Sequence, residues 1–138
     1  MIRVVLDTNI IVSALLQPLG PSAQIFTMAL SGSIQMCMTG PVYAEYEEVI
    51  RRPRLKRSDE IITATLQSIR DNALWVRPSD KVRACLDPDD DMFLECAQAA
   101  RADYLVTGNT KDFPISWEGT PVITPRAMLD HIINRRSS

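Results

Sequence analysis

The sequence is poor in several features that mark common classes of protein. Only three cysteines occur in 138 residues, Cys37, Cys85 and Cys96, and each lies in or beside an apolar run. An odd number of cysteines in such places favours reduced, buried thiols over a disulfide framework, and they show no metal-ligand spacing. We therefore expect a cytoplasmic protein whose fold does not depend on disulfides.

Glycine-rich phosphate-binding turns are also absent. Asp7, Thr8 and Asn9 follow the first predicted strand, where a Rossmann cofactor site needs glycines, and no Walker A loop occurs. The longest apolar stretch near the N-terminus is broken by Asp7 and Asn9 and lacks a basic leader with a cleavage site. We expect neither a signal peptide nor a membrane span.

Neither excess charge nor histidine points to a function. Fifteen Lys and Arg against 17 Asp and Glu give a net charge of −2, so a basic surface for nucleic acid must be local. The single histidine, His131, falls on the last predicted helix beside the tail, and we assign it no catalytic role. The length and an ordinary apolar content fit one globular domain with one core.

Strand-like and helix-like segments alternate along the chain. Short apolar runs rich in β-branched residues predict strands, and helical periodicity after capping residues or prolines predicts helices. This alternation predicts a single α/β domain over residues 1–138, in three layers with helices on both faces of a parallel sheet, and a frayed tail at 134–138. We expect strands at residues 2–6, 34–38, 73–76, 104–107 and 121–123, and helices at 10–16, 22–30, 41–52, 59–72, from 92, and from 125.

The densest chemical feature is an acidic run at residues 87–91, followed at once by the helical run Met92–Ala97. Four carboxylates in five residues repel one another, so without a cation or firm solvation their pKa values are expected to rise. Helical periodicity puts Asp90 beside Leu94 and Ala97, at the margin of the apolar face and pointing toward the protein.

The other acids of this run have a simpler interpretation. Asp91 is predicted on the solvent side of the helix with Glu95 and Gln98. Asp87 and Asp89 are predicted to be turn and cap residues, which the helix dipole favours. An acidic helix cap without further function is therefore the alternative to a site.

Further polar residues follow the ends of two predicted strands. Asp7 ends the first strand, and Asn109 and Asp112 lie just beyond the fourth. In parallel α/β sheets ligands bind beyond the carboxyl ends of the strands, where the strand order reverses. These side chains therefore converge if strands one and four are neighbours, a pairing that the sequence leaves open.

The helix predicted from Pro41 offers another acid. Glu48 lies opposite its apolar stripe and is expected in solvent, whereas Glu45 and Glu47 border the stripe on either side. Periodicity alone does not choose between these two glutamates.

Together these segments resemble the PIN domain. The resemblance rests on residues 4–9, the helix with Glu45, Asp90 at a helix start, and residues 105–109. More closely, the chain resembles the bacterial toxin components of toxin–antitoxin pairs in that family, the VapC-like ribonucleases; this likeness includes Gly20-Pro21, the Asp-Pro-Asp-Asp run and Thr124-Pro125-Arg126. It implies a five-stranded parallel sheet in the order 3-2-1-4-5 and a nuclease that cleaves RNA with Mg²⁺ or Mn²⁺.

Position by position, the resemblance implies that Asp7, Glu45 and Asp90 are catalytic acids that bind the metal. The helical-face argument selects Asp90 over Asp91 independently. Clustered carboxylates are hard oxygen ligands that suit Mg²⁺ or Mn²⁺.

The fourth site position has two candidates. Many relatives have an aspartate where Asn109 stands, and others use an acid a few residues later, a role that Asp112 fills. Thr8 and Asn9 resemble residues that orient the first acid, and Thr107 and Asn109 are expected to support the site.

Five cations in seven residues form a basic segment just after the Glu45 helix. It is either a solvated linker or a clamp that holds the RNA backbone without reading its sequence. Its members are Arg51, Arg52, Arg54, Lys56 and Arg57.

Other functions are weaker matches. Phosphatases that form an aspartyl-phosphate need a second aspartate two positions after the first, where this chain has Asn9. A PIN fold that binds nucleic acid or protein without cutting, and a housekeeping RNA-processing nuclease, remain as alternatives to a toxin.

A protein partner is the last expectation. Two short predicted helices between Ile10 and Leu30 carry many large apolar side chains, and exposed apolar surface marks interfaces. Either both helices pack fully on the sheet, or part of this surface binds a small antitoxin, as the resemblance implies, or a second copy in a homodimer. The side chains are Leu15, Leu16, Leu19, Ile25, Phe26, Met28 and Leu30.

Overall fold

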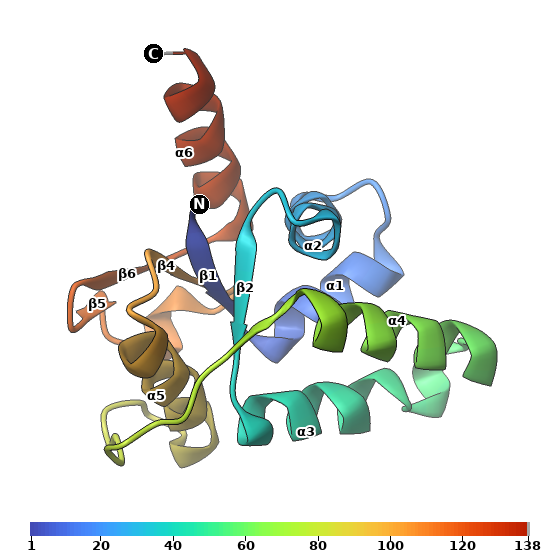
Figure 1. Cartoon of the computed structure of the whole chain (residues 1–138), viewed down its shortest axis with the longest axis horizontal. Coiled ribbons are helices and arrows are strands. Elements are labelled where there is room, and N and C mark those ends of the chain that lie inside the picture. Colours follow the sequence, from blue (N-terminus) through green and yellow to red (C-terminus); the bar gives the residue numbers. More distant parts are fainter. Residues whose placement is uncertain (138) are drawn as a thin grey trace.

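The computed structural model describes residues 1–137, with side chains described through residue 134 (Figure 1). Within this range six strands form one sheet in the order β3-β2-β1-β4-β6-β5. All neighbouring strands are parallel except β5 and β6. The strands are β1 (Arg3–Leu6), β2 (Gln35–Met38), β3 (Leu74–Trp75), β4 (Tyr104–Val106), β5 (Ser116–Trp117) and β6 (Thr120–Ile123).

The predicted sheet order is confirmed, because the predicted fifth strand is β6 and the five parallel strands follow the order 3-2-1-4-5. The additional strand β5 lies in the segment predicted as loop. A tight hairpin joins it to β6 through Glu118 and Gly119, which both have positive φ, 49° and 85°. Such hairpin turns favour Asn-Gly or Gly-Gly, so a Glu-Gly pair gave a weak signal.

Helices begin where the sequence supplies caps. The Ser58 hydroxyl accepts a hydrogen bond from the Ile61 N–H at 3.2 Å, and the Thr39 and Thr124 hydroxyls cap two further helices in the same way. The N-cap of α2 is Gly20 and not Ser22, because Pro21 takes the first helical position. The helices are α1 (Thr8–Leu16), α2 (Pro21–Ser31), α3 (Gly40–Ile50), α4 (Asp59–Asn72), α5 (Asp91–Ala100) and α6 (Pro125–Ser137), with 3-10 turns η1 (Pro53–Leu55), η2 (Pro88–Asp90) and η3 (Thr110–Asp112).

Helices cover the sheet in two groups. Helix α5 contacts β1, β2, β4 and β5. Helices α2 and α6 contact one another, and α2 also contacts β2 while α6 contacts β4. Figure 1 shows α1, α2 and α4 on the other side of β2 from α5. The middle strand β1 is the centre of the core, since Val4, Val5 and Leu6 are fully buried.

Three smaller expectations concern the termini, membranes and cysteines. The backbone of α6 stays helical to Ser137, but Ser138 and the side chains of residues 135–138, which include most of the predicted frayed tail, lie outside the described residues.

Within residues 1–137 no single helix is long and apolar enough to cross a membrane. Helices α1 and α2, bent by 107°, reach the length and apolar composition of a membrane span only when taken as a pair. All three cysteines are free, with Cys37 and Cys96 buried and Cys85 half-buried.

Candidate active site

Asp7 sits where the central strand ends. Leu6 pairs with Val106 in β4, and the Asp7 N–H donates to the Val106 carbonyl at 2.9 Å, so the two strands whose pairing was open are neighbours. Asp7 is buried at the N-cap position of α1, yet its side chain does not cap the helix. Its Oδ2 instead accepts a hydrogen bond from the Thr107 hydroxyl at 2.7 Å. The carboxylate is therefore fixed between β1 and β4.

Burial raises the pKa of Asp7 above its ordinary value. The Thr107 hydroxyl and the backbone N–H groups of Thr8 and Asn9 oppose this rise, because they stabilise the ionised form. The charge of Glu45 adds to it, which puts Glu45 within electrostatic reach of Asp7.

Glu45 is turned toward the same site from α3. The Thr8 hydroxyl donates a hydrogen bond to Glu45 Oε2, and this contact distinguishes Glu45 from its neighbours. Glu47 lies at the surface 3.6 Å from Arg51, and Glu48 is exposed as predicted, 3.2 Å from Arg52.

Tyr46 was missed as a site-positioning residue, because its side chain was counted only as part of an apolar stripe. It is fully buried, and its hydroxyl donates to the Leu6 carbonyl immediately before Asp7. This bond joins α3 to the end of β1. A tyrosine directly after a candidate acid was the available signal, since buried tyrosine hydroxyls need a partner.

Asp90 is the third acid of the group formed by Asp7, Glu45, Asp90 and Asp112, here called the acidic cluster. It ends η2 immediately before α5, is half-buried, and makes no side-chain cap. Burial, followed by the charges of Asp7, Asp87, Asp112 and Glu45, raises the pKa of Asp90 to about 6. Asp87 belongs to the same turn as Asp90, and the other three carboxylates come from separate segments of the chain.

The prediction for Asp91 was wrong. Asp91 is buried, and its Oδ1 accepts hydrogen bonds from the backbone N–H groups of Ala84 at 3.1 Å and Cys85 at 2.8 Å. Glu95, one turn later, accepts from the Val82 N–H at 3.0 Å. The connection between β3 and α5 thus covers the side of the helix expected in solvent, which helical periodicity does not register. Burial tends to raise the pKa of Asp91, but the bonds from Cys85 and Ala84 leave it lowered.

This geometry predicts a difference between two substitutions of Asp91. Asp91→Asn keeps the accepting oxygen and should change the free energy of unfolding by less than about 1 kcal/mol. Asp91→Ala removes the acceptor of two N–H groups and should cost about 1–3 kcal/mol. Urea unfolding of both variants measures the difference. Equal costs would show that the hydrogen bonds to the β3–α5 connection do not matter.

The segment after β4 carries both candidates for the fourth position. The Asn9 Oδ1 accepts from the Gly108 N–H at 3.3 Å, and the Asn109 N–H donates to the Thr107 hydroxyl at 3.0 Å, so α1 and β4 shape this turn together. The Asn109 residue is exposed, and its side chain makes no hydrogen bond within the described residues. Asp112 is half-buried in η3, and its charge contributes to the raised pKa of Asp90. Asp112 is therefore the candidate that acts on the other acids.

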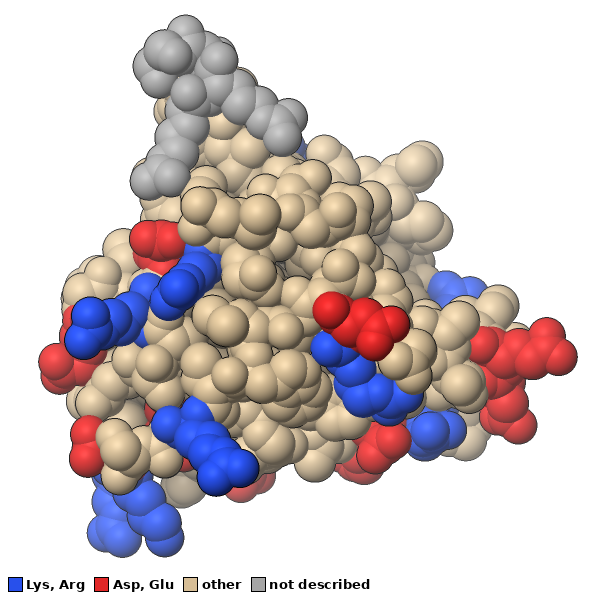
Figure 2. Space-filling view, viewed as in Figure 1, with Lys and Arg blue, Asp and Glu red and all other residues tan. Residues whose placement is uncertain are grey.

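The basic segment divides into two parts. Arg51 and Arg52 pair with glutamates one turn earlier in α3, and Arg57 donates to the Leu15 carbonyl. Arg54 and Lys56 are exposed and take part in no ion pair among the described residues. On the face shown in Figure 2, Lys and Arg lie in small separate groups with Asp and Glu between them, so this face has no continuous basic stripe.

The acidic cluster fits a divalent cation by its chemistry. It offers hard carboxylate oxygens that repel one another, and burial plus this repulsion raises the pKa of Asp90. Within the described residues no three His, Cys, Asp or Glu side chains are grouped tightly enough to hold an ion as they stand. Mg²⁺ suits such an open arrangement, since it keeps several waters and takes only one or two carboxylates together with substrate phosphates.

A family model described as PIN domain matches residues 3–111, well over half of the chain. The chain belongs to the PIN domain family. PIN domains are generally nucleases and generally use divalent metals. Uncharacterized protein MJ1680 from Methanocaldococcus jannaschii is 25% identical to this PIN domain over 111 residues, 78% of this chain and 71% of that protein.

Two solved structures contain chains similar to this PIN domain. One is VapBC2 from Rickettsia felis bound to a DNA fragment from their promoter, with a TM-score of 0.57 and 16% identity over 89% of this chain and 98% of that chain. The other is FitAB bound to IR36 DNA, with a TM-score of 0.50 and 16% identity over 88% and 94% of the two chains. At such identity the likeness establishes the fold alone.

Proposed function

We propose that this PIN domain is a metal-dependent endoribonuclease that hydrolyses RNA phosphodiester bonds. Asp7, Glu45, Asp90 and Asp112 are its catalytic acids, and the first three hold Mg²⁺ or Mn²⁺. The observation that carries the proposal is the surroundings of Asp90, whose pKa is raised to about 6 by burial and then by carboxylates from three other parts of the fold. A cluster that repels its own charges is suited to a cation and to the phosphate that a cation attracts.

Each residue of the cluster has a distinct task. When bound, the metal lowers the pKa of a water molecule and polarises the phosphoryl group. Thr107 holds the Asp7 carboxylate, and Thr8 holds that of Glu45, so two ligands are oriented before the ion arrives. If a single metal ion is bound and leaves one of these carboxylates free, Asp90 or Glu45 positions the attacking water and accepts its proton.

Cleavage of a panel of RNAs by the purified protein, with and without Mn²⁺, tests the proposal. Wild-type protein should cut RNA only with the metal, and both EDTA and Asp7→Asn should abolish cutting. Activity that survives in the Asp7→Asn sample belongs to a contaminating nuclease. A folded protein that binds RNA without cutting it would instead be a non-cleaving binding module.

We also propose that the nuclease is a cytoplasmic toxin held inactive by a small antitoxin protein, and that it forms a homodimer. Chains of similar fold occur in the VapBC2 and FitAB structures, each solved on a DNA fragment. The corner between α1 and α2 supports a partner surface, because Leu16 is 55% exposed and Leu19 94% exposed. Ile25 and Phe26, by contrast, are buried in the core, so only part of this apolar surface is free for a partner.

Bacterial growth tests the toxin role. Expression of the chain alone should slow growth, Asp7→Asn should remove the effect, and co-expression of the neighbouring small open reading frame should restore growth. Normal growth with abundant, soluble, metal-active protein would favour a housekeeping RNA-processing nuclease. Size-exclusion chromatography with light scattering measures the dimer.

The basic segment is proposed to hold the RNA backbone, mainly through the cations that α3 does not neutralise. Changing Arg54, Lys56 and Arg57 together to Gln should weaken RNA binding and lower the slope of log affinity against log salt by about 2, since each phosphate contact on single strands contributes about 0.7. Fluorescence anisotropy at several salt concentrations measures this slope. The matched control changes three exposed cations of the β3–α5 connection, Arg77, Lys81 and Arg83, and should leave the slope nearly unchanged. An equal slope in wild type and the first variant would make the segment a solvated linker.

A further inference from the structure

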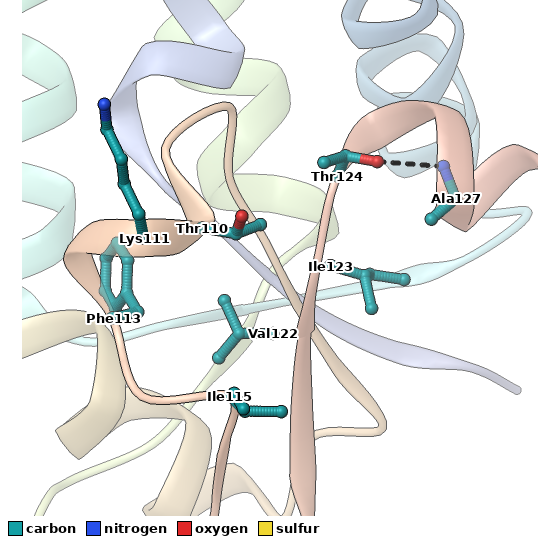
Figure 3. A pocket seen from close by; sticks show the side chains of 8 residues that line it. All are labelled: Thr110, Lys111, Phe113, Ile115, Val122, Ile123, Thr124 and Ala127. Atoms are coloured by element: carbon teal, nitrogen blue, oxygen red, sulfur yellow. Dashed lines mark hydrogen bonds between the residues drawn. The ribbon is translucent and has the colours of Figure 1, made fainter.

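An open pocket of about 570 Å³ lies at the carboxyl edge of the sheet, beside the end of β6 (Figure 3). Its walls are the turn after β4, strand β6 and the first turn of α6. Phe113, Ile115 and Val122 give it a mostly apolar lining. Ile115 is 91% exposed, so its side chain is accessible to a ligand in the pocket.

The three-residue turn η3 joins the pocket to the acidic cluster. Thr110 and Lys111 line the pocket, and the next residue, Asp112, is the one whose charge acts on Asp90. The pocket wall and the acidic cluster are therefore linked by consecutive residues of one short turn. Figure 3 shows Lys111 extending away from the other lining side chains, so its ammonium is free to meet a phosphate at the rim.

Polar groups are present in the lining but few. The Thr124 hydroxyl accepts from the Ala127 N–H at 3.1 Å and keeps its own hydrogen to donate. The Thr110 hydroxyl has no hydrogen-bond partner within the described residues. The apolar wall suits the face of a flat ring, the two hydroxyls suit polar atoms on the edge of that ring, and the Lys111 ammonium suits a phosphate joined to it.

We propose that this pocket binds a nucleobase of the RNA substrate, one that flanks the phosphodiester bond held at the acidic cluster. The inference rests on the proposed ribonuclease function and adds a base-binding subsite to it. The volume is in the range of small-ligand pockets and exceeds what one base needs, so both purines and pyrimidines enter. An apolar protein side chain would use the lining but leave Lys111 and both hydroxyls without a role.

Nuclear magnetic resonance of isoleucine methyl groups tests base binding without any cleavage. Adenosine and uridine 5′-monophosphates, which contain no phosphodiester bond, are titrated into the full chain, with ribose 5-phosphate as the control that lacks a base. The methyl signals of Ile115 and Ile123 should shift with the nucleotides and not with ribose 5-phosphate, while that of Ile10 in the core stays fixed. Ala127→Leu fills the pocket and should weaken these shifts by about tenfold, the worth of one stacked base.

The matched control is Ala64→Leu, the same change in an exposed helical alanine that lines a different open pocket on α4. It should leave nucleotide binding within about twofold of wild type, less than the loss of one stacked base. Equal shifts with ribose 5-phosphate, no shift at Ile115, or shifts that survive Ala127→Leu would each overturn the proposal. If the methyl signals of Ile115 and Ile123 shift with a co-expressed protein partner but not with the nucleotides, the pocket binds that protein and the proposal is wrong.

Cleavage then separates this inference from the function on which it rests. In RNA with a single abasic position, wild-type kcat/KM at the adjacent bond should fall about tenfold, and Ala127→Leu should remove the difference between intact and abasic RNA. Cleavage that ignores the abasic position would refute the subsite and leave the ribonuclease standing. No cleavage of any RNA would refute the ribonuclease, whatever the methyl shifts.

Discussion

Replacing Asp90 with asparagine is expected to lower RNA cleavage by about 1000-fold, the range of a residue that holds or deprotonates the attacking water. The same change should stabilise the metal-free protein, because it removes the carboxylate that burial and four neighbouring acids disfavour. A rise of the pKa from 3.8 to about 6 corresponds to about 3 kcal/mol, and Asp90 is half-exposed. After discounting for solvent screening, we expect a gain of about 1 kcal/mol at pH 7.

The sign of the pH dependence follows from the raised pKa of Asp90. The folded state holds this proton more tightly than the unfolded state, so the stabilisation of wild type is fully present below pH 3.8 and is lost as the pH rises through about 6. The advantage of Asp90→Asn should therefore be largest above pH 7 and vanish near pH 4.

Urea unfolding in EDTA at pH 4, 5 and 7.5, together with cleavage assays in Mn²⁺, measures both effects. Asp91→Asn is the neighbouring control and should retain cleavage. If Asp91→Asn abolishes cleavage and Asp90→Asn does not, the roles of the two aspartates are reversed. An Asp90→Asn protein that is less stable than wild type at pH 7.5 would mean that Asp90 is not repelled in the fold.

Thr107→Val is expected to damage the site through Asp7. Thr107 is fully buried and donates to Asp7 while accepting from the Asn109 N–H, so a valine of the same shape leaves both groups without this partner. We expect a loss of about 1–3 kcal/mol in the free energy of unfolding at pH 7. Metal affinity and cleavage should fall by about 10- to 100-fold, as for other residues that orient metal ligands. The cost in stability should shrink at low pH, because a protonated Asp7 no longer needs the donor.

Thr120→Val is the matched control. Thr120 is a buried threonine in β6 whose hydroxyl donates to the Ala102 carbonyl at 2.7 Å, away from the acidic cluster. Its loss should lower stability equally at all pH values and leave the cleavage rate of the folded protein unchanged. Identical behaviour of the two valine variants would rule out a specific role of Thr107.

Local sequence signals were sufficient for most of the fold. The apolar run before Asp7 predicts β1, Ser58 caps the start of α4, and Gly32, with φ of 82°, ends α2. The strand order came from the family resemblance rather than from composition or periodicity. The β5–β6 hairpin at Glu118-Gly119 was not predicted, because its turn residues are atypical for a tight hairpin.

The candidate site was less predictable because its contacts join distant segments. Periodicity left Glu45 and Glu47 equal. The family resemblance favoured Glu45, and in the structure the hydrogen bond from Thr8 distinguishes it. The wrong placement of Asp91 has the same origin, since residues 84 and 85 cover its side of α5. The catalytic role of Asp90 remains a prediction.

Titration of the metal-free protein with Mn²⁺, followed by electron paramagnetic resonance of the free ion, tests most directly whether the acidic cluster is one metal site. Wild-type protein should bind Mn²⁺ at pH 7.5, and its affinity should fall as the pH drops below about 6, where protons compete with the ion for Asp90. Asp7→Asn, Glu45→Gln and Asp90→Asn should each weaken binding at least about tenfold. The neighbouring changes Glu47→Gln and Asp91→Asn should not. Absence of Mn²⁺ binding in wild type, or equal binding in Asp7→Asn, would contradict a metal site at these carboxylates.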